Sequence, residues 1–424
     1  MRRADLLFLL AGLLCGVLLL SAPQASAQGV TIGGTPTDAK GDGGGLTAMF
    51  AGDRFENFRN MGRFVPTSTM PPAAKPWSLG KNKDSLLYSG TFLGKATSLE
   101  DFIALSDTSA FLVIQDGQVI YERYAHGDRV DSLHTSFSVA KSFTSALIGI
   151  ALGEGKIESL SDPIRKYLPE LTSKTFDGVT IRHVLQMSSG VRFNEKYTDP
   201  DADINRMIGM VPPMSYLEYI NTLAREHAPG TFNHYASINT QLLGILLIRV
   251  TGEPLTEYMT RKLWHPLGME HPGLWTLDSD GNELAMGGLA ASARDYAKLG
   301  LLYMQEGKRD GAQLLPSGWA KESVTPNQAH LMPGENPGSS NTAGYMYQWW
   351  TPRKWDGDFL ARGIWGQGIY VHPGNRVVIV KLAADQKNFD ARYKLAYIDY
   401  MQALAQSFGA PAAKAPSAEL SAAP

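Results

Sequence analysis

A helix that is apolar around much of its circumference constrains the fold more than any other feature of this 424-residue chain. Residues 139–152 read Val-Ala-Lys-Ser-Phe-Thr-Ser-Ala-Leu-Ile-Gly-Ile-Ala-Leu. Such a helix is expected to be buried, because it offers no broad polar face to water. The rest of the chain must enclose it, and the length is ample for two or three structural units with a large core.

Strand signals stand on both sides of a helical middle section. Residues 110–115 and 118–124 flank an Asp-Gly turn and predict a β-hairpin. Strands at both ends with helices between them predict an α/β fold, in which one antiparallel sheet is flanked by helices and interrupted by an inserted all-helical domain. The later strands are predicted over 345–350, 359–362, 368–372 and 377–382, and the helices over 181–187, 215–223, 238–250, 255–263, from 292 onward and over 393–408.

This pattern and the composition set the expected boundaries. Many glycines and few large apolar residues predict a flexible lead-in from residue 28 to about 50. We expect this lead-in and the C-terminal tail, residues 410–424, to be dispensable for chemistry. The predicted parts are a signal peptide (1–27), a flexible and wrapping N-terminal extension (28–84), an α/β sheet domain (85–155 and 280–409), an all-helical domain (156–279) and a disordered tail (410–424).

The first 27 residues have the pattern of a secretory signal peptide. Two arginines precede an apolar run, and an Ala-Ser-Ala site predicts cleavage after Ala27. A membrane anchor is the alternative, but the run is shorter than the ~20 residues that a span needs. Cleavage would remove Cys15, the single cysteine, so the mature protein would have no thiol nucleophile. We expect a secreted or periplasmic protein without a stable membrane anchor.

The composition disfavours several classes of function. Lys and Arg number 39 against 41 Asp and Glu, which gives a net charge of -2 and no basic footprint for nucleic acid. No Cys/His grouping has the spacing of a zinc site, and no metal or other cofactor is expected. The partner that we expect is a small-molecule substrate.

The strongest local signal is Ser138-Val-Ala-Lys141, at the start of the apolar helix. On a helix, a spacing of three residues places hydroxyl and amine on one face, where a neutral lysine can take the serine proton. Burial lowers the pKa of a lysine and would keep Lys141 neutral. Ser78-Leu-Gly-Lys81 has the same pattern, but it lies in the extension and contains a glycine, so Ser138 is favoured. A structural lysine that reaches the surface is the alternative.

Two further elements follow along the chain. Tyr235 lies on a loop that begins with Pro-Gly and precedes a predicted helix, where its hydroxyl can exchange a proton with a nearby nucleophile. Residues 361–368, Ala-Arg-Gly-Ile-Trp-Gly-Gln-Gly, contain glycines that permit close approach of a ligand to backbone N–H groups. Taken singly, a packed tyrosine and an ordinary turn explain both elements.

Together these elements resemble the serine beta-lactamase-like, penicillin-recognising hydrolase superfamily, in its class C, esterase and D-aminopeptidase-like branch. The family order is Ser-x-x-Lys, then Tyr-x-Asn, then a Lys- or His-Thr-Gly strand, and the resemblance covers about residues 88–408. Residues 137–144 and 363–373 are most similar to 6-aminohexanoate-dimer hydrolases. Other family-like stretches are 179–190, 266–269 and 287–295.

The resemblance implies a fold and a catalytic set. The fold would be of the beta-lactamase/transpeptidase type. Ser138 would form the acyl ester, Lys141 and Tyr235 would remove its proton, and Tyr235 would protonate the leaving group. By motif position, the backbone N–H groups of Ser138 and Ile364 would form the oxyanion hole.

Two departures from the family pattern affect the substrate. Ser237 stands where the family has Asn, and Ala-Arg-Gly at 361–363 replaces the Lys- or His-Thr-Gly triplet. A beta-lactam carboxylate would lose its usual partners, although Arg362 can substitute if it points inward. We therefore rank efficient beta-lactam hydrolysis low.

The remaining candidates for substrate binding carry open alternatives. Tyr197 belongs to a polar loop, which the resemblance suggests is a lid and which can equally be a solvated acidic loop. Trp365 is expected to line an acyl pocket or to pack in the core. With these two, the predicted substrate-binding residues are Tyr197, Ser237, Arg362, Gly363 and Trp365.

We therefore predict a serine hydrolase that cleaves amide or ester bonds of small substrates through a covalent acyl-serine, resembling a 6-aminohexanoate-dimer hydrolase or a carboxylesterase. A D-Ala-D-Ala peptidase or beta-lactamase acting on cell-wall-like substrates is the alternative. A catalytically inactive binding protein on the same fold is the alternative of another class. The presence of Ser138, Lys141 and Tyr235 disfavours it.

Overall fold

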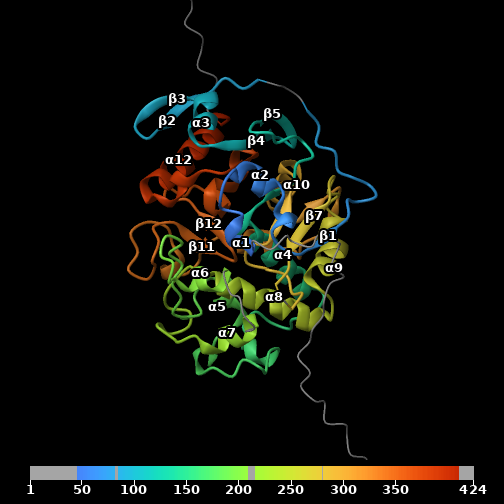
Figure 1. The fold of residues 1–424 in the computed structure, drawn as a ribbon, viewed down its shortest axis with the longest axis vertical. Helices are drawn as coiled ribbons and strands as arrows, with labels where there is room; N and C mark the ends of the chain where they lie inside the picture. Colours follow the sequence, from blue (N-terminus) through green and yellow to red (C-terminus); the bar gives the residue numbers. More distant parts are fainter. Residues whose placement is uncertain (1–44, 82–84, 209–214, 279, 410–424) are drawn as a thin grey trace, which may run out of the picture. The chain divides into compact units, whose positions relative to one another are not determined.

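The structure, a computed structural model, describes residues 45–81, 85–208, 215–278 and 280–409 (Figure 1). These residues all belong to one structural unit, Ile32–Pro424. The predicted signal peptide, the start of the extension and the predicted tail lie outside the described residues. None of the helices in the described part of the chain is both long and apolar enough to cross a membrane.

A seven-stranded antiparallel sheet lies at the centre of the fold, in the order β11-β12-β13-β14-β15-β4-β5. The early hairpin β4–β5 pairs with β15, a strand from the last part of the chain, as the predicted fold class requires. The seven strands are β4 (Thr108–Gln115), β5 (Gln118–Tyr124), β11 (Gly344–Met346), β12 (Trp349–Thr351), β13 (Phe359–Gly363), β14 (Gln367–His372) and β15 (Val377–Ala383).

Helices cover both faces of this sheet, so alternate residues of a strand enter different cores. On β4, Leu112 belongs to the core that contains α10 (Ala293–Met304), whereas Phe111 belongs to the core that contains α12 (Ala391–Ser407). In the described residues the other α-helices are α1 (Gly45–Ala48), α2 (Arg54–Arg59), α3 (Leu99–Leu105), α4 (Ala140–Gly153), α5 (Ile181–Leu185), α6 (Asp203–Ile208), α7 (Tyr216–Thr222), α8 (Ser237–Thr251), α9 (Leu255–Met259) and α11 (Trp319–Val324).

Helix α4 is enclosed by other elements, as its apolar sequence predicts. Every residue from Ala140 to Ala151 is buried. At Gly149 a side chain would collide with Trp319 of α11, so glycine lets these two helices approach closely. Helix α8 packs along α4, and in Figure 1 the helices α5 and α7 (green) lie on the same side of the fold as α8.

The predicted all-helical domain is not wholly helical. Its last part contains β7 (Gly273–Thr276), which pairs with β1 (Thr67–Met70) of the extension and with β8 (Leu289–Ala291). Strand β6 (His134–Thr135) pairs with β8 and extends this second sheet. A strand of four residues is too short to show alternation in the sequence, and its partners come from distant parts of the chain.

The predicted strand over 345–350 is in fact two strands joined by a turn. Gln348, between β11 and β12, has a φ of 64°. Its buried side chain accepts a hydrogen bond from the Thr240 hydroxyl and donates one to the Leu185 carbonyl. The continuous run of aromatic residues concealed this turn, because the groups that stabilise it come from α5 and α8.

The lead-in that was expected to be dispensable reaches the candidate site. Helix α1 begins at Gly45, Met49 is buried, and the ring of Phe50 stacks on Phe137 and on Trp365 at centroid distances of 5.9 and 5.8 Å. The expectation followed from the glycines that precede this segment. The predicted flexibility was wrong for residues 45–50, because a few apolar side chains are enough to dock a short segment on a distant apolar surface.

Candidate active site

Ser138 is held next to α4 by a constrained backbone. It lies in a 3₁₀ turn, Phe137–Val139, between β6 and α4. Phe137, directly before it, has a φ of 47°, which a bulky residue adopts only when its surroundings fix it. The rings of Phe50 and Phe58 supply these surroundings, at centroid distances of 5.9 and 5.1 Å from the Phe137 ring. Residues distant in sequence therefore determine where the Ser138 side chain lies.

Lys141 follows Ser138 by one helical turn, and its side chain is buried. Its Nζ lies 3.1 Å from Ser138 Oγ and donates a hydrogen bond to the Met286 carbonyl at 2.5 Å. Burial lowers the pKa of Lys141 to about 7, although the charge of Glu195 opposes this shift. A substantial fraction of Lys141 is therefore neutral at pH 7 and has a lone pair for the serine proton.

Tyr235 lies beside the same pair. Lys141 Nζ is 5.4 Å from the centroid of its ring, and the ring stacks on Trp350 at 5.0 Å. Burial and the charge of Glu195 raise the pKa of Tyr235, while hydrogen bonding with Ser138 acts in the opposite direction. The phenol is therefore protonated at neutral pH and can donate a proton, whereas Lys141 is the group that can accept one.

A tight turn brings Ile364 to Ser138. At Gly363 a side chain would collide with the carbonyl oxygen of Ser136, so only glycine lets β13 end this close to the segment that carries Ser138. The turn continues through Gly366, whose φ is 88°. The buried amine of Lys381, on β15, donates a hydrogen bond to the Gly366 carbonyl at 3.3 Å and stabilises the turn.

The cleft around Ser138 has a volume of ≈ 250 Å³ and carries two cations. The guanidinium of Arg362 lies 4.0 Å from the centroid of the Trp350 ring. Lys394 of α12 lines the same cleft, and burial together with the charge of Arg362 lowers its pKa to about 8. In the part of the chain that the structure describes, neither cation forms an ion pair with a carboxylate. Glu195 lines the same cleft, but its carboxylate accepts hydrogen bonds from the Tyr197 and Ser237 hydroxyls. The two cations outnumber this carboxylate, so the cleft favours an anionic group.

Glu195, which the sequence analysis did not single out, links two predicted site residues. Its carboxylate accepts hydrogen bonds from the Tyr197 hydroxyl at 2.7 Å and from the Ser237 hydroxyl and backbone N–H at 2.5 and 2.8 Å. Ser237 is thus bound to a carboxylate of this chain. No local pattern identifies Glu195, because its partner Ser237 lies 42 residues away.

The structure brings most of the predicted site residues together. Ser237 lines an adjoining pocket rather than the cleft. Trp365 lines neither, because it is buried against Phe50 and Phe389, so core packing describes its place. Among the described residues, no three His, Cys, Asp or Glu side chains gather as metal ligands would. The predicted residues that line the cleft are Ser138, Tyr197, Tyr235, Arg362, Gly363 and Ile364.

Known proteins resemble the chain in sequence and in fold. A family model described as Beta-lactamase matches residues 106–401. The 6-aminohexanoate-dimer hydrolase of Paenarthrobacter ureafaciens is 31% identical over 295 residues, which cover 68% of this chain and 75% of that protein. A beta-lactamase of Escherichia coli (strain K12) is 29% identical over 169 residues, 38% of this chain and 42% of that protein. A solved structure from Bacillus anthracis, provisionally named a 6-aminohexanoate-dimer hydrolase, has a TM-score of 0.75 at 25% identity and covers 88% of this chain and 99% of that one.

Proposed function

The chain belongs to the beta-lactamase family of serine hydrolases, and on that premise we propose that it cleaves amide or ester bonds of small substrates through an acyl ester on Ser138. The observation that carries the proposal is the 3.1 Å separation between Lys141 Nζ and Ser138 Oγ. Burial lowers the pKa of Lys141 to about 7 there, which suits a general base at neutral pH.

Each proton in the proposed reaction has a donor and an acceptor. Ser138 Oγ attacks the carbonyl carbon while neutral Lys141 takes its proton. The backbone N–H groups of Ser138 and Ile364 stabilise the oxyanion, at about 3 kcal/mol for each donor. Tyr235 then donates its proton to the leaving amine or alcohol and regains one from Lys141. Water attacks the acyl ester next, and its proton returns to Ser138 Oγ as the bond to the acyl group breaks.

The cations of the cleft support a further statement about the leaving group. The leaving group receives its proton from Tyr235, and Tyr235 lines the cleft together with Arg362 and Lys394. We therefore propose that the leaving group carries a carboxylate, as 6-aminohexanoate does. A carboxylate in this position would form charge-assisted hydrogen bonds that neither cation makes with a carboxylate of the described residues.

A D-Ala-D-Ala peptidase or beta-lactamase is the second candidate, because those substrates also present a carboxylate to the cations. We rank it lower, because Ser237 is bound to Glu195 instead of being available to a substrate amide. A catalytically inactive binding protein is the candidate of another class. The contact between Ser138 and a lysine of lowered pKa argues against it.

Labelling with a fluorophosphonate probe, followed by intact mass measurement, tests the nucleophile. We expect one adduct on the wild-type protein, none on Ser138→Ala, and one on Ser78→Ala. The last variant is the matched control, because Ser78 also precedes a lysine by three residues and is exposed. Ser138→Ala should also lower kcat/KM for p-nitrophenyl butanoate by at least about 10³-fold. Full labelling and hydrolysis by Ser138→Ala would contradict the proposal, and an unlabelled wild-type protein would favour the inactive binding protein.

Turnover of the 6-aminohexanoate dimer, a D-Ala-D-Ala peptide and a cephalosporin separates the two enzymatic candidates. We expect the amide with a 6-aminohexanoate leaving group to be cleaved with the higher kcat/KM. A preference for the cephalosporin or for the peptide would reverse the ranking.

We also propose that the protein is exported and cleaved after Ala27. N-terminal sequencing of the protein recovered from an exporting host should then read Gln28 as the first residue. Recovery with an intact Met1 from the membrane fraction would support the anchor instead.

A further inference from the structure

A second, apolar pocket adjoins Ser138. Ser138, Tyr197 and Ile364 line both this pocket and the cationic cleft. The cations of the cleft and Tyr235 do not line the pocket, and none of the described residues that line it carries a charge. The two openings at the nucleophile therefore differ in chemistry, one attracting an anion and the other an apolar group.

The N-terminal extension closes this pocket. Leu46, Met49, Phe50 and Met61 form its extension side. Opposite them lie residues of the folded body, among them Met286, whose carbonyl accepts the hydrogen bond of the catalytic lysine. The pocket has a volume of ≈ 40 Å³, which is room for about three groups of the size of a water molecule.

Acyl transfer at one serine needs three directions around the carbonyl carbon. The oxyanion points to the N–H groups of Ser138 and Ile364, and the leaving group points to its proton donor, Tyr235, in the cationic cleft. The acyl substituent must take another direction. The apolar pocket is the other opening that contains both Ser138 and Ile364.

We propose that this apolar pocket binds the acyl chain of the substrate and that the N-terminal extension sets the length of chain it accepts. The inference rests on the proposed function and narrows its substrate class. The pocket suits a short uncharged acyl chain such as butanoyl. A 6-aminohexanoyl chain ends in an ammonium group, and none of the described residues that line the pocket is a carboxylate. The nearby Glu195 carboxylate already accepts hydrogen bonds from Tyr197 and Ser237 of the lining, so burying this ammonium group costs free energy. The preferred substrates are therefore short-chain acyl derivatives of amino or hydroxy acids.

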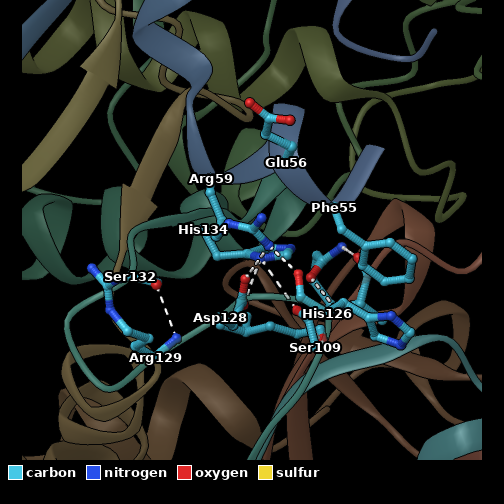
Figure 2. Close-up of polar contacts among 12 residues, drawn as sticks. Phe55, Glu56, Arg59, Ser109, His126, Asp128, Arg129, Ser132 and His134 are labelled. Carbon is cyan, nitrogen blue, oxygen red and sulfur yellow. Dashed lines mark hydrogen bonds and ion pairs between the residues drawn. The ribbon is translucent and has the colours of Figure 1, made fainter. Parts of the chain in front are cut away.

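The extension is docked firmly enough to act as a wall. Phe50 lies between the rings of Phe137 and Trp365, with interplanar angles of 26° and 17°. Figure 2 shows Arg59 of α2 and His134 both reaching Asp128; the Arg59–Asp128 ion pair measures 2.8 Å and the His134–Asp128 pair 3.4 Å. Asp128 is buried, and these partners keep its pKa below the usual range although burial raises it. If the extension left its place, Asp128 would lose Arg59 and remain a buried charge with fewer partners. The free-energy cost of that state keeps the extension docked.

Three amides with one leaving group test the acyl pocket. N-butanoyl-6-aminohexanoate, N-octanoyl-6-aminohexanoate and the 6-aminohexanoate dimer differ only in the acyl part. In the full-length protein we expect kcat/KM for the butanoyl compound to exceed that for each of the others by at least about tenfold. The octanoyl chain is too long for the pocket, and the 6-aminohexanoyl chain carries a charge.

Variants of the extension sharpen the test. Met49→Ala enlarges the pocket and should lower the ratio of butanoyl to octanoyl turnover at least about fivefold, whereas Leu46→Trp fills it and should lower butanoyl turnover relative to an acetyl compound. Phe55→Ala is the matched control, because Phe55 also belongs to the extension but stacks on His126 at 3.9 Å and does not line the pocket (Figure 2). The fraction of Ser138 that reacts with the fluorophosphonate probe corrects each rate for properly folded protein.

The outcomes separate the two proposals. Shifted chain-length ratios in Met49→Ala and Leu46→Trp, with an unshifted ratio in Phe55→Ala, support the acyl pocket. Unchanged ratios in proteins that label fully at Ser138 overturn the pocket but leave the hydrolase standing. Equal turnover of the dimer and the butanoyl compound overturns it as well. A wild-type protein that does not label at Ser138 overturns the proposed function, and the acyl pocket with it.

Discussion

The two openings at Ser138 differ in origin as well as in chemistry. The cationic cleft takes its positive charges from Arg362 of β13 and Lys394 of α12, and both residues lie within the residues 106–401 that match the family model. One side of the apolar pocket comes from residues 46–61, before that match begins. The difference indicates that the proposed catalytic residues and the proposed leaving-group side belong to the part that matches the family, whereas a segment outside that match lines the proposed acyl side. Substitutions can therefore affect the two sides separately or together.

The largest effect is expected when Lys141 is substituted, because the proposed reaction needs this residue whatever the acyl group or the leaving group. Lys141→Ala should lower kcat/KM by about 10³-fold for every substrate, whatever its acyl chain or leaving group, because Lys141 is the proposed acceptor of the Ser138 proton. In the wild-type protein kcat/KM should rise with pH through about 7, because Lys141 must lose its own proton before it can accept one. Steady-state kinetics between pH 5 and pH 9 measures both effects.

Lys81→Ala is the control for this substitution, since Lys81 stands in the other Ser-x-x-Lys match. We expect its activity to stay within about twofold of the wild-type value. Two results would contradict the role of Lys141 as general base. One is a loss of kcat/KM in Lys141→Ala for one substrate class alone, and the other is a wild-type kcat/KM that falls as pH rises through 7.

An intermediate effect is confined to the cationic cleft. Arg362→Ala and Lys394→Ala should each raise KM about 10- to 100-fold for N-butanoyl-6-aminohexanoate, because each removes a charge-assisted hydrogen bond to the carboxylate. The KM for p-nitrophenyl butanoate, which has no carboxylate, should change little. Lys387→Ala is the control, because Lys387 is paired with Asp107 and does not line the cleft. Equal losses on both substrates would show that these cations act on structure or on the acyl side.

The smallest effect concerns Glu195, which lies beside both openings through Tyr197 and Ser237. Its negative charge raises the pKa of Lys141, against the larger effect of burial. Glu195→Gln should therefore lower the pKa of Lys141 and move the rising limb of the pH profile toward lower pH by a few tenths of a unit. Gln keeps the size and one of the two accepting oxygens of Glu195, so the profile of p-nitrophenyl butanoate hydrolysis reports mainly the loss of the charge. A limb that moves toward higher pH would reverse the sign proposed here.

Local sequence patterns were enough to predict the fold class and the family. The predicted antiparallel sheet and the resemblance to the beta-lactamase family are confirmed by the strand order and by the comparisons. The apolar helix at α4, the early hairpin and the last three strands, β13, β14 and β15, all lie within a few residues of their predicted bounds. These elements were predictable because their periodicity and turn residues belong to one short segment each.

The errors share one physical cause. The strand β7, the turn at Gln348 and the docking of the lead-in all depend on partners from distant parts of the chain. Trp365 stands next to Ile364 but packs away from both openings, because Phe50 and Phe389 lie against its ring. Neighbours in sequence say little about which side of a turn a side chain takes.

By itself the sequence determined the apolar helix, the Ser138–Lys141 spacing on it, the order of the motifs and hence the family. Those features need one segment of chain at a time. Only the tertiary structure decided which charges and apolar side chains meet at Ser138: Glu195, Lys394 and the apolar side chains of residues 46–50 reach its two openings from three separate parts of the chain. Burial then lowers the pKa of Lys141, and burial is produced by everything that packs around a group. A spacing of three residues can place a serine and a lysine together, but only the fold around them lowers the pKa of the lysine to a value that suits the proposed base.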